Sequence, residues 1–123
     1  MNDGYEEVLK LAAQLGEAIR RHQRYVKLRE TDEQVRNDKS ATDALEAYNR
    51  AAEDAARKER SGQPIEVEDK RRLRALQETV AGNASVKAFM AAQADYAELM
   101  RKMNDAIYQA IAVEEGGGTV EAP

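Results

Sequence analysis

Apolar residues recur along most of this chain at steps of three and four positions, the spacing that places them on one face of an α-helix. The first such stretch extends from about Tyr5 to Arg21, with Asn2 or Asp3 available as its N-cap. We predict that the apolar face of this helix is buried. That face consists of Val8, Leu11, Ala12, Leu15 and Ile19.

Two further helices precede the clearest turn of the chain. One covers about 23–36 with a weak apolar row, which indicates the edge of a bundle. The next begins at Asp38 or Ser40, whose side-chain oxygens can accept the free amides of a helix start, and it ends near Arg60. Residues 61–64, Ser-Gly-Gln-Pro, end it, because glycine can adopt the left-handed conformation and proline cannot continue a helix.

The remaining pattern predicts a fourth helix over about 66–81 and a much longer fifth helix over 84–113, with Asn83 as the N-cap of the fifth. About 30 residues at 1.5 Å each give the fifth helix a length of roughly 45 Å, more than a compact domain of this size is wide. It therefore needs other helices along its whole length. Positions 86, 93, 100 and 107 recur every seven residues, which permits a coiled-coil-like seam.

The pattern as a whole predicts an all-α fold of about five helices, an antiparallel helical bundle with one long C-terminal helix. We assign residues 1–113 to a single bundle domain. Residues 114–123 are acidic and contain three successive glycines, so we expect a flexible tail there.

The composition makes the core of this bundle thin. Leu, Ile, Val and Phe contribute 21 of the 123 residues, about 17 %, below the roughly 20 % typical of chains that fold. The 22 alanines compensate in part, because alanine favours helix and lets helices approach closely. We therefore expect a second copy of the chain, in a dimer or higher oligomer, or another partner to bury part of the apolar surface.

Charge and cysteine content exclude several classes of protein. The formal net charge of -4 and the regular periodicity argue against a disordered chain. With no cysteine, the chain has neither disulfides nor a thiolate metal site. No apolar run approaches the ~18 residues of a membrane helix, and the first ten residues are acidic where a secretory signal would be basic. We therefore expect a cytoplasmic protein that does not contact the membrane.

No set of residues has the pattern of an active site. His22, the single histidine, lies among arginines without a partner for acid–base chemistry, and we expect a surface role for it. The glycines lack a phosphate-binding spacing. Several carboxylates precede a base by four residues, which stabilises exposed helices without any catalytic purpose. Examples are Asp54 with Lys58, Glu68 with Arg72 and Glu98 with Lys102. We predict no enzyme activity, no catalytic or metal-binding residues, no cofactor and no small-molecule substrate.

Two basic clusters indicate an alternative function. Residues 20–29 and 57–74 are rich in lysine and arginine, and a patch formed from both could contact RNA phosphates or an acidic partner. A solvated surface explains the same clusters, and apart from Tyr25 no aromatic residue is interleaved for base stacking. The candidate residues are Arg20, Arg21, Arg24, Lys27, Arg29, Lys70, Arg71, Arg72 and Arg74.

Large apolar residues of the third and fifth helices are candidates for an interface with another subunit. The methionines among them suit an adaptable apolar interface, although the same residues could form the core of the chain itself. They are Leu45, Tyr48, Val86, Phe89, Met90, Tyr96, Met100, Met103 and Ile107.

One ordered series of residues runs through the predicted helices and breaks. It consists of Leu15, Ile19, Tyr25, Asp38, Leu45, Tyr48, Gly62, Leu73, Leu76, Asn83, Val86, Tyr96 and Leu99. The order of these features over residues 5–113 resembles the YlbF/YmcA family of small helical bacterial regulators. Each helix alone is generic, and the succession of lengths and breaks carries the resemblance.

This resemblance implies a non-enzymatic protein that self-associates or joins related helical subunits. It implies complexes that influence competence, sporulation and biofilm formation and that are tied to the endoribonuclease RNase Y and messenger RNA maturation. Some members of such complexes are associated with iron–sulfur clusters through cysteines; this chain has none, so cluster binding is not carried over. Our interpretation is a regulatory or adaptor protein that acts through protein–protein contacts, with a nucleic-acid-binding module as the alternative.

Overall fold

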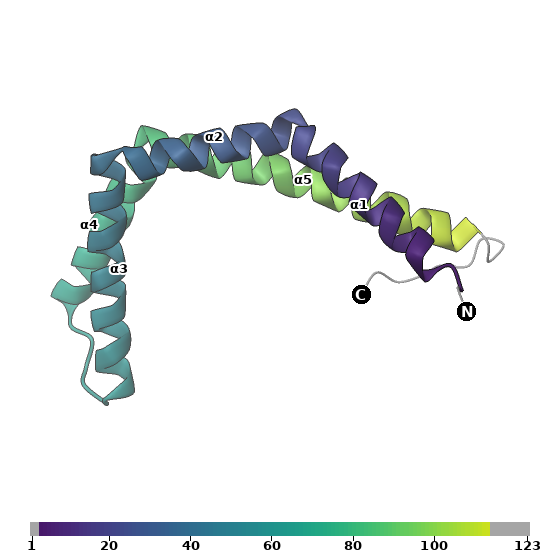
Figure 1. Ribbon diagram of the computed structural model, residues 1–123. Helices are drawn as coiled ribbons and strands as arrows, with labels where there is room; N and C mark the ends of the chain where they lie inside the picture. The colour runs from purple at the N-terminus through teal and green to yellow at the C-terminus, as the bar shows by residue number, and fades with distance from the viewer. Residues whose placement is uncertain (1–2, 114–123) are drawn as a thin grey trace. The chain divides into compact units, whose positions relative to one another are not determined.

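The computed structural model describes residues 3–113, which fold into five helices (Figure 1). The helices are α1 (Tyr5–Arg21), α2 (Gln23–Asn37), α3 (Lys39–Arg60), α4 (Val67–Gly82) and α5 (Ala84–Val113). The all-α class, the five helices and the long C-terminal helix are confirmed for these residues. The predicted tail, 114–123, lies outside the described residues, and the dimeric state stays a prediction.

The predicted caps explain where two of the helices begin. Oδ1 of Asp38 accepts hydrogen bonds from the backbone amides of Ser40 and Ala41, at 3.0 and 3.3 Å, at the start of α3. Oδ1 of Asn83 accepts the amide of Val86 at 3.1 Å at the start of α5. Both caps are confirmed.

The start of α1 differs from the prediction. Gly4 occupies the N-cap position with a φ of 93°, in the left-handed region that glycine adopts at little cost. The side chain of Asp3 still contributes, because its Oδ1 accepts the amide of Tyr5 at 3.1 Å. The acidic residue therefore stabilises the helix start from one position before the cap.

The turn at residues 61–64 folds α3 and α4 into an antiparallel hairpin (Figure 1). Gly62 has a φ of 78°, as expected of a glycine that ends a helix. Beyond the turn, the backbone amide of Glu66 donates to Oδ2 of Asp69 at 3.0 Å, which satisfies a free amide at the start of α4.

The contacts between residues group the chain into two compact units. Of the described residues, 3–28 and 92–113 make up the first unit, and 29–91 make up the second. Helices α2 and α5 each contribute residues to both units.

Alanine forms most of the core of the second unit. Ala41, Ala44 and Ala51 of α3 are buried, together with Val86 of α5. The only buried polar side chain among the described residues is that of Thr31. This core agrees with the predicted close approach of helices along an alanine face.

The first unit has a smaller core. Ala92 is its one buried residue among those described. Contacts between α2 and α5 include the rings of Tyr25 and Tyr96, which lie 5.8 Å apart, and a hydrogen bond of 3.0 Å from Nη1 of Arg24 to the carbonyl oxygen of Asp95. No residue of α1 is buried.

The prediction that the chain buries the apolar face of α1 is therefore wrong. Hydrophobic periodicity shows that a helix has an apolar face, but it does not identify the molecule that covers this face. Here the other residues of the described range, 3–113, do not cover it.

Candidate interaction surfaces

Helix α1 presents a row of large apolar side chains to solvent. Tyr5, Val8 and Leu11 are 67 %, 65 % and 57 % exposed, and Leu15 is 37 % exposed. Monomeric soluble proteins rarely expose a contiguous apolar face of this kind, and such faces commonly mark protein–protein contacts. The apolar face of α1 is the first candidate interaction surface.

The end of α5, in the same unit, is also apolar and exposed. Ile107 and Ile111 are 42 % and 49 % exposed, and Val113 is exposed as well. Ile107 is one of the predicted interface residues, and Ile111 follows it one helical turn later. The first unit thus carries unburied apolar surface on two of its helices.

The structure places the predicted interface residues in three environments. Val86 is buried in the core of the second unit, whereas Met90 and Ile107 are exposed. The half-buried ones are Leu45, Tyr48, Phe89, Tyr96, Met100 and Met103. Residues up to Met90 belong to the second unit and those from Tyr96 onward to the first, so the set describes two separate surfaces.

In the second unit, Tyr48 and Met90 line an apolar hollow of about 460 Å³. Val86 forms part of its wall, and Lys87 supplies a cation at its edge. The residues from α4 that complete it are Gln77, Val80 and Ala81. Sequence periodicity does not show that α3, α4 and α5 leave a hollow between them.

The caps of α3 and α5 are joined by hydrogen bonds. The hydroxyl of Ser85 donates to Oδ2 of Asp38 at 2.7 Å, and Nδ2 of Asn83 donates to Oγ of Ser40 at 3.2 Å. Hydrogen bonds from Ser40 and Ser85 hold the pKa of Asp38 below its ordinary value of 3.8. This polar cluster fixes the starts of the two helices relative to each other.

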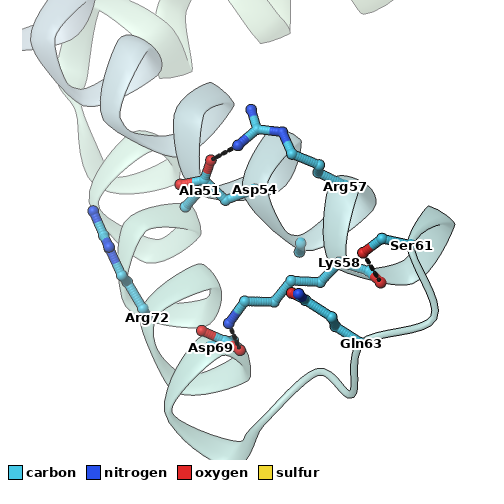
Figure 2. Close-up of a pocket in the computed structure, with 9 residues that line it drawn as sticks. Ala51, Asp54, Arg57, Lys58, Ser61, Gln63, Asp69 and Arg72 are labelled. Carbon is cyan, nitrogen blue, oxygen red and sulfur yellow. Dashed lines mark hydrogen bonds and ion pairs between the residues drawn. The ribbon is translucent and has the colours of Figure 1, made fainter.

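The end of the α3–α4 hairpin next to its turn holds a second polar cluster. Figure 2 shows the side chain of Lys58 reaching from α3 toward Asp69 on α4, with Gln63 beside it. Nζ of Lys58 lies 2.7 Å from Oδ2 of Asp69, the oxygen that also accepts the amide of Glu66. This hydrogen bond lowers the pKa of Asp69 and raises the pKa of Lys58. The pair closes the hairpin.

These residues line a pocket of about 650 Å³ that also contains Arg57 and Arg72 (Figure 2). Nη1 of Arg57 lies 3.3 Å from Oδ1 of Asp54, and both carboxylates of the pocket are therefore paired with bases. Three bases and two acids line the pocket, which gives it a small excess of positive charge. The pair of Lys58 and Asp69 joins α3 to α4, whereas the pair of Arg57 and Asp54 lies within α3.

The two predicted basic clusters lie in different units. Residues 57–74 belong to the second unit, and the cluster at 20–29 belongs to the first unit except for Arg29, which is in the second unit. In the first cluster, Arg24 is engaged with the carbonyl of Asp95. The exposed bases of this cluster are Arg20, Arg21, Lys27 and Arg29. In the second cluster, Arg71 pairs with Glu68 at 3.2 Å. Lys70, Arg72 and Arg74 are exposed on α4.

His22 has a structural role at the junction of α1 and α2. Its Nδ1 accepts the backbone amide of Arg24 at 3.0 Å, as an N-cap side chain does. Its carbonyl oxygen accepts the amides of Tyr25 and Val26, both at 3.0 Å. The single histidine therefore serves as a half-buried cap for α2.

The predicted ion pairs are formed in part. Glu98 pairs with Lys102 at 3.5 Å as predicted. Asp54 and Glu68 instead pair with bases three residues onward, and Lys58 pairs across the hairpin with Asp69. Residues three and four apart are neighbours on one helix face, so the sequence did not distinguish between them.

Residues 3–113 contain neither a cluster of metal-ligating side chains nor a membrane-spanning helix. Among residues 3–113, no group of three or more His, Cys, Asp or Glu side chains could hold a metal ion. None of the helices in this range is long and apolar enough to cross a membrane.

Sequence reasoning missed the exposed face of α1 as an interaction surface. A usable signal was present: α1 is strongly amphipathic, while the whole chain has only 21 Leu, Ile, Val and Phe residues with which to cover several such faces. The composition indicated a thin core and a need for outside cover, but it did not indicate that α1 is the helix without cover.

Comparison with known proteins adds one finding. No curated protein and no solved structure matches the chain. Residues 8–112 match the protein family described as control of competence regulator ComK, YlbF/YmcA. The match begins at Val8 in α1 and ends one residue before the last residue of α5, so it includes most of both described units and all five helices. The chain belongs to the YlbF/YmcA family of competence regulators.

Proposed function

We propose that this chain is a non-enzymatic regulator that acts as an adaptor, through contacts with a second copy of itself or with related helical subunits. The observation that carries the proposal is the exposed apolar face of α1, on which Tyr5, Val8 and Leu11 are all more than half exposed. Burying a large apolar side chain fully contributes about 1.5–3 kcal/mol, so covering this face strongly favours association. Membership of a family of competence regulators supports the regulatory role.

The titratable groups support a role without catalysis. The pKa values of Asp38, Asp69 and Glu98 are lowered, and those of Lys39 and Lys58 are raised. In each case the largest cause is a hydrogen bond to a neighbouring side chain in a helix cap or an ion pair. Shifts at catalytic sites arise instead from burial and from like charges that converge on a cleft.

Size-exclusion chromatography with light scattering at micromolar concentration tests the self-association. We expect an oligomer for the natural chain and a shift toward monomer for Leu11→Glu, because a charge replaces an exposed apolar contact. Gln14→Glu is the matched control, since Gln14 is an exposed polar residue of the same helix. Circular dichroism checks that both variants stay helical.

A monomer in the natural chain at that concentration argues against self-association. Affinity capture from the native organism then decides whether a different subunit covers α1. Recovery of related helical proteins, lost in Leu11→Glu and kept in Gln14→Glu, supports the adaptor role.

A nucleic-acid-binding module is the second candidate, because α4 exposes Lys70 and Arg74, which form no ion pair with any residue in 3–113. It has less support, because acids pair with Arg57, Lys58 and Arg71 of the same hairpin. It predicts an affinity for RNA that falls steeply with salt and weakens when Arg71, Arg72 and Arg74 are neutralised. No gel shift at low salt would dismiss it.

A further inference from the structure

We propose that the apolar hollow between α3, α4 and α5 binds an acidic amphipathic helix of a different protein. An apolar side chain of that helix fills the hollow, and its carboxylates lie against Arg74 and Lys87. This inference goes beyond the proposed function, because the hollow belongs to the second unit and contains no residue of α1. An adaptor needs two separate binding surfaces, and this hollow is the second.

The hollow is apolar and open to solvent. Met90 in its lining is 60 % exposed, whereas Val86 beside it is buried. Tyr48 and Val80, which also line it, are half-buried. The flexible side chain of methionine adapts to different apolar contacts. A concave apolar surface of this kind suits the apolar side of an amphipathic helix.

A basic stripe on α4 continues from the hollow. Four exposed residues of this helix are separated by four, three and four positions, so they lie on one side of it. They are Lys70, Arg74, Gln77 and Ala81. Gln77 and Ala81 line the hollow, and the two bases therefore lie one and two turns before Gln77 on the same side. The stripe is roughly 16 Å long, enough for about three turns of a partner helix.

The bases on this surface have no acidic partner in the chain. Lys70, Arg74 and Lys87 form no ion pair with any described residue. Residues 70–94 contain five bases and one acid, Glu78, although the whole chain has a net charge of -4. Unpaired bases beside an apolar hollow favour an occupant that is both apolar and negatively charged.

The same features argue against a second copy and against RNA as the occupant. A twofold interface places the same patch on both sides, so two copies that met through this surface would bring their bases together. RNA would neutralise the bases, but its sugars and phosphates would leave the apolar hollow unfilled. Of the described residues that line the hollow, only Tyr48 is aromatic and could stack on a base.

Designed peptides test the charge and the apolar contact separately. The probe is a fluorescein-labelled helical peptide of about four turns, with leucines at steps of three and four residues and glutamates beside them. A second peptide has lysines in place of the glutamates, and a third has alanines in place of the leucines. We expect fluorescence anisotropy to show binding of the first peptide to the natural chain. The second should bind several-fold more weakly, and the third about tenfold more weakly or less, because it buries no leucine.

A charge exchange locates the site. Arg74→Glu should weaken the binding of the glutamate peptide several-fold and strengthen that of the lysine peptide, and adding Lys87→Glu should extend both effects. Arg72→Glu is the matched control, because Arg72 is an exposed base of the same helix that lines the other pocket. It should change either affinity much less. Equal effects of Arg74→Glu and Arg72→Glu would show a response to overall charge and would overturn the inference.

Filling the hollow tests the apolar contact without changing any charge. Ala81→Trp should weaken the glutamate peptide several-fold, because the ring occupies the hollow. Ala75→Trp is its control, since Ala75 is an exposed residue of α4 that is not among those lining the hollow. Circular dichroism checks that all variants stay helical. A labelled single-stranded RNA that binds, is released by Arg74→Glu and is unaffected by Ala81→Trp would overturn the inference in favour of a nucleic-acid-binding module.

Photo-cross-linking in the native organism identifies the natural occupant. A photoreactive amino acid at position 77 should capture a peptide of another protein in which acids flank apolar residues at steps of three and four, and one at position 75 should not. Capture of a segment of this chain, or equal capture from both positions, would contradict the inference. A natural chain that binds no glutamate peptide would also overturn it, while self-association measured by light scattering would still support the proposed function.

Discussion

The hydroxyl of Ser85 donates a hydrogen bond of 2.7 Å to Oδ2 of Asp38, across a sequence separation of 47 residues. The other oxygen of the same carboxylate caps α3. Asn83 has the equivalent double role, because its Oδ1 caps α5 while its Nδ2 donates to Oγ of Ser40. Each cap therefore holds both its own helix and the start of the other.

Removing the bond between the helices should destabilise the second unit without removing a cap. We expect Ser85→Ala to lower the free energy of unfolding by roughly 1 kcal/mol, the usual net contribution of a hydrogen bond. Urea unfolding followed by circular dichroism measures it. Ser61→Ala is the control, since the hydroxyl of Ser61 bonds only to the carbonyl of Lys58 in its own turn. Equal effects of the two substitutions would show that the bond to Asp38 has no special role.

Stability should decrease in acid because of Asp38 and Asp69. Hydrogen bonds from Ser40 and Ser85 lower the pKa of Asp38 in the folded chain, and the hydrogen bond from Lys58 lowers that of Asp69. The unfolded chain then binds protons more readily than the folded chain. The contribution of each carboxylate is complete above the ordinary pKa of 3.8 and is lost as the pH falls through the lower folded value.

The urea midpoint, measured from pH 7 to pH 3, tests this prediction. Asp38→Asn and Asp69→Asn should each be less stable at pH 7 and should lose less stability in acid than the natural chain. The opposite sign applies to Lys58: its pKa is raised by Asp69, so its contribution disappears only as the pH rises through a value above 10.5. Parallel pH profiles for the natural chain and both variants would refute the assignment.

The helices could be predicted from the sequence because their ends depend on local chemistry. Asp38 and Asn83 accept amides two or three residues away, and Gly62 ends α3 through its own backbone conformation. The bond between Ser85 and Asp38 could not be predicted in this way. Periodicity and capping residues mark where each helix starts, but they do not show that the two starts meet.

The exposure of α1 was unpredictable for a related reason. The spacing of Val8, Leu11 and Leu15 defines an apolar face, and the same spacing results whether the cover comes from the same chain or from another. The core of the first unit depends on how α5 approaches α1 and α2, which local patterns do not encode. Val86 and Met90 are four residues apart on α5, yet Val86 is buried and Met90 is 60 % exposed. Their spacing puts both on one helix face, but it does not show which of them a neighbouring helix covers.

The junction of α1 and α2 should depend on the side chain of His22. We expect His22→Ala to cost about 1 kcal/mol of stability, because the amide of Arg24 loses the acceptor that caps α2. His22→Asn should retain most of the stability, since asparagine is also an effective N-cap. Thermal unfolding of the two variants checks this. If asparagine is as harmful as alanine, the ring contributes through packing and not through its Nδ1.

Gly16→Ala should stabilise α1. A Cβ atom added at Gly16 meets no atom within 4 Å, so alanine should raise the free energy of unfolding by up to about 1 kcal/mol. The physical reason is that glycine in the middle of a helix loses more conformational freedom on folding than alanine does. Thermal unfolding followed by circular dichroism measures the effect, and an unchanged or lower midpoint would contradict it.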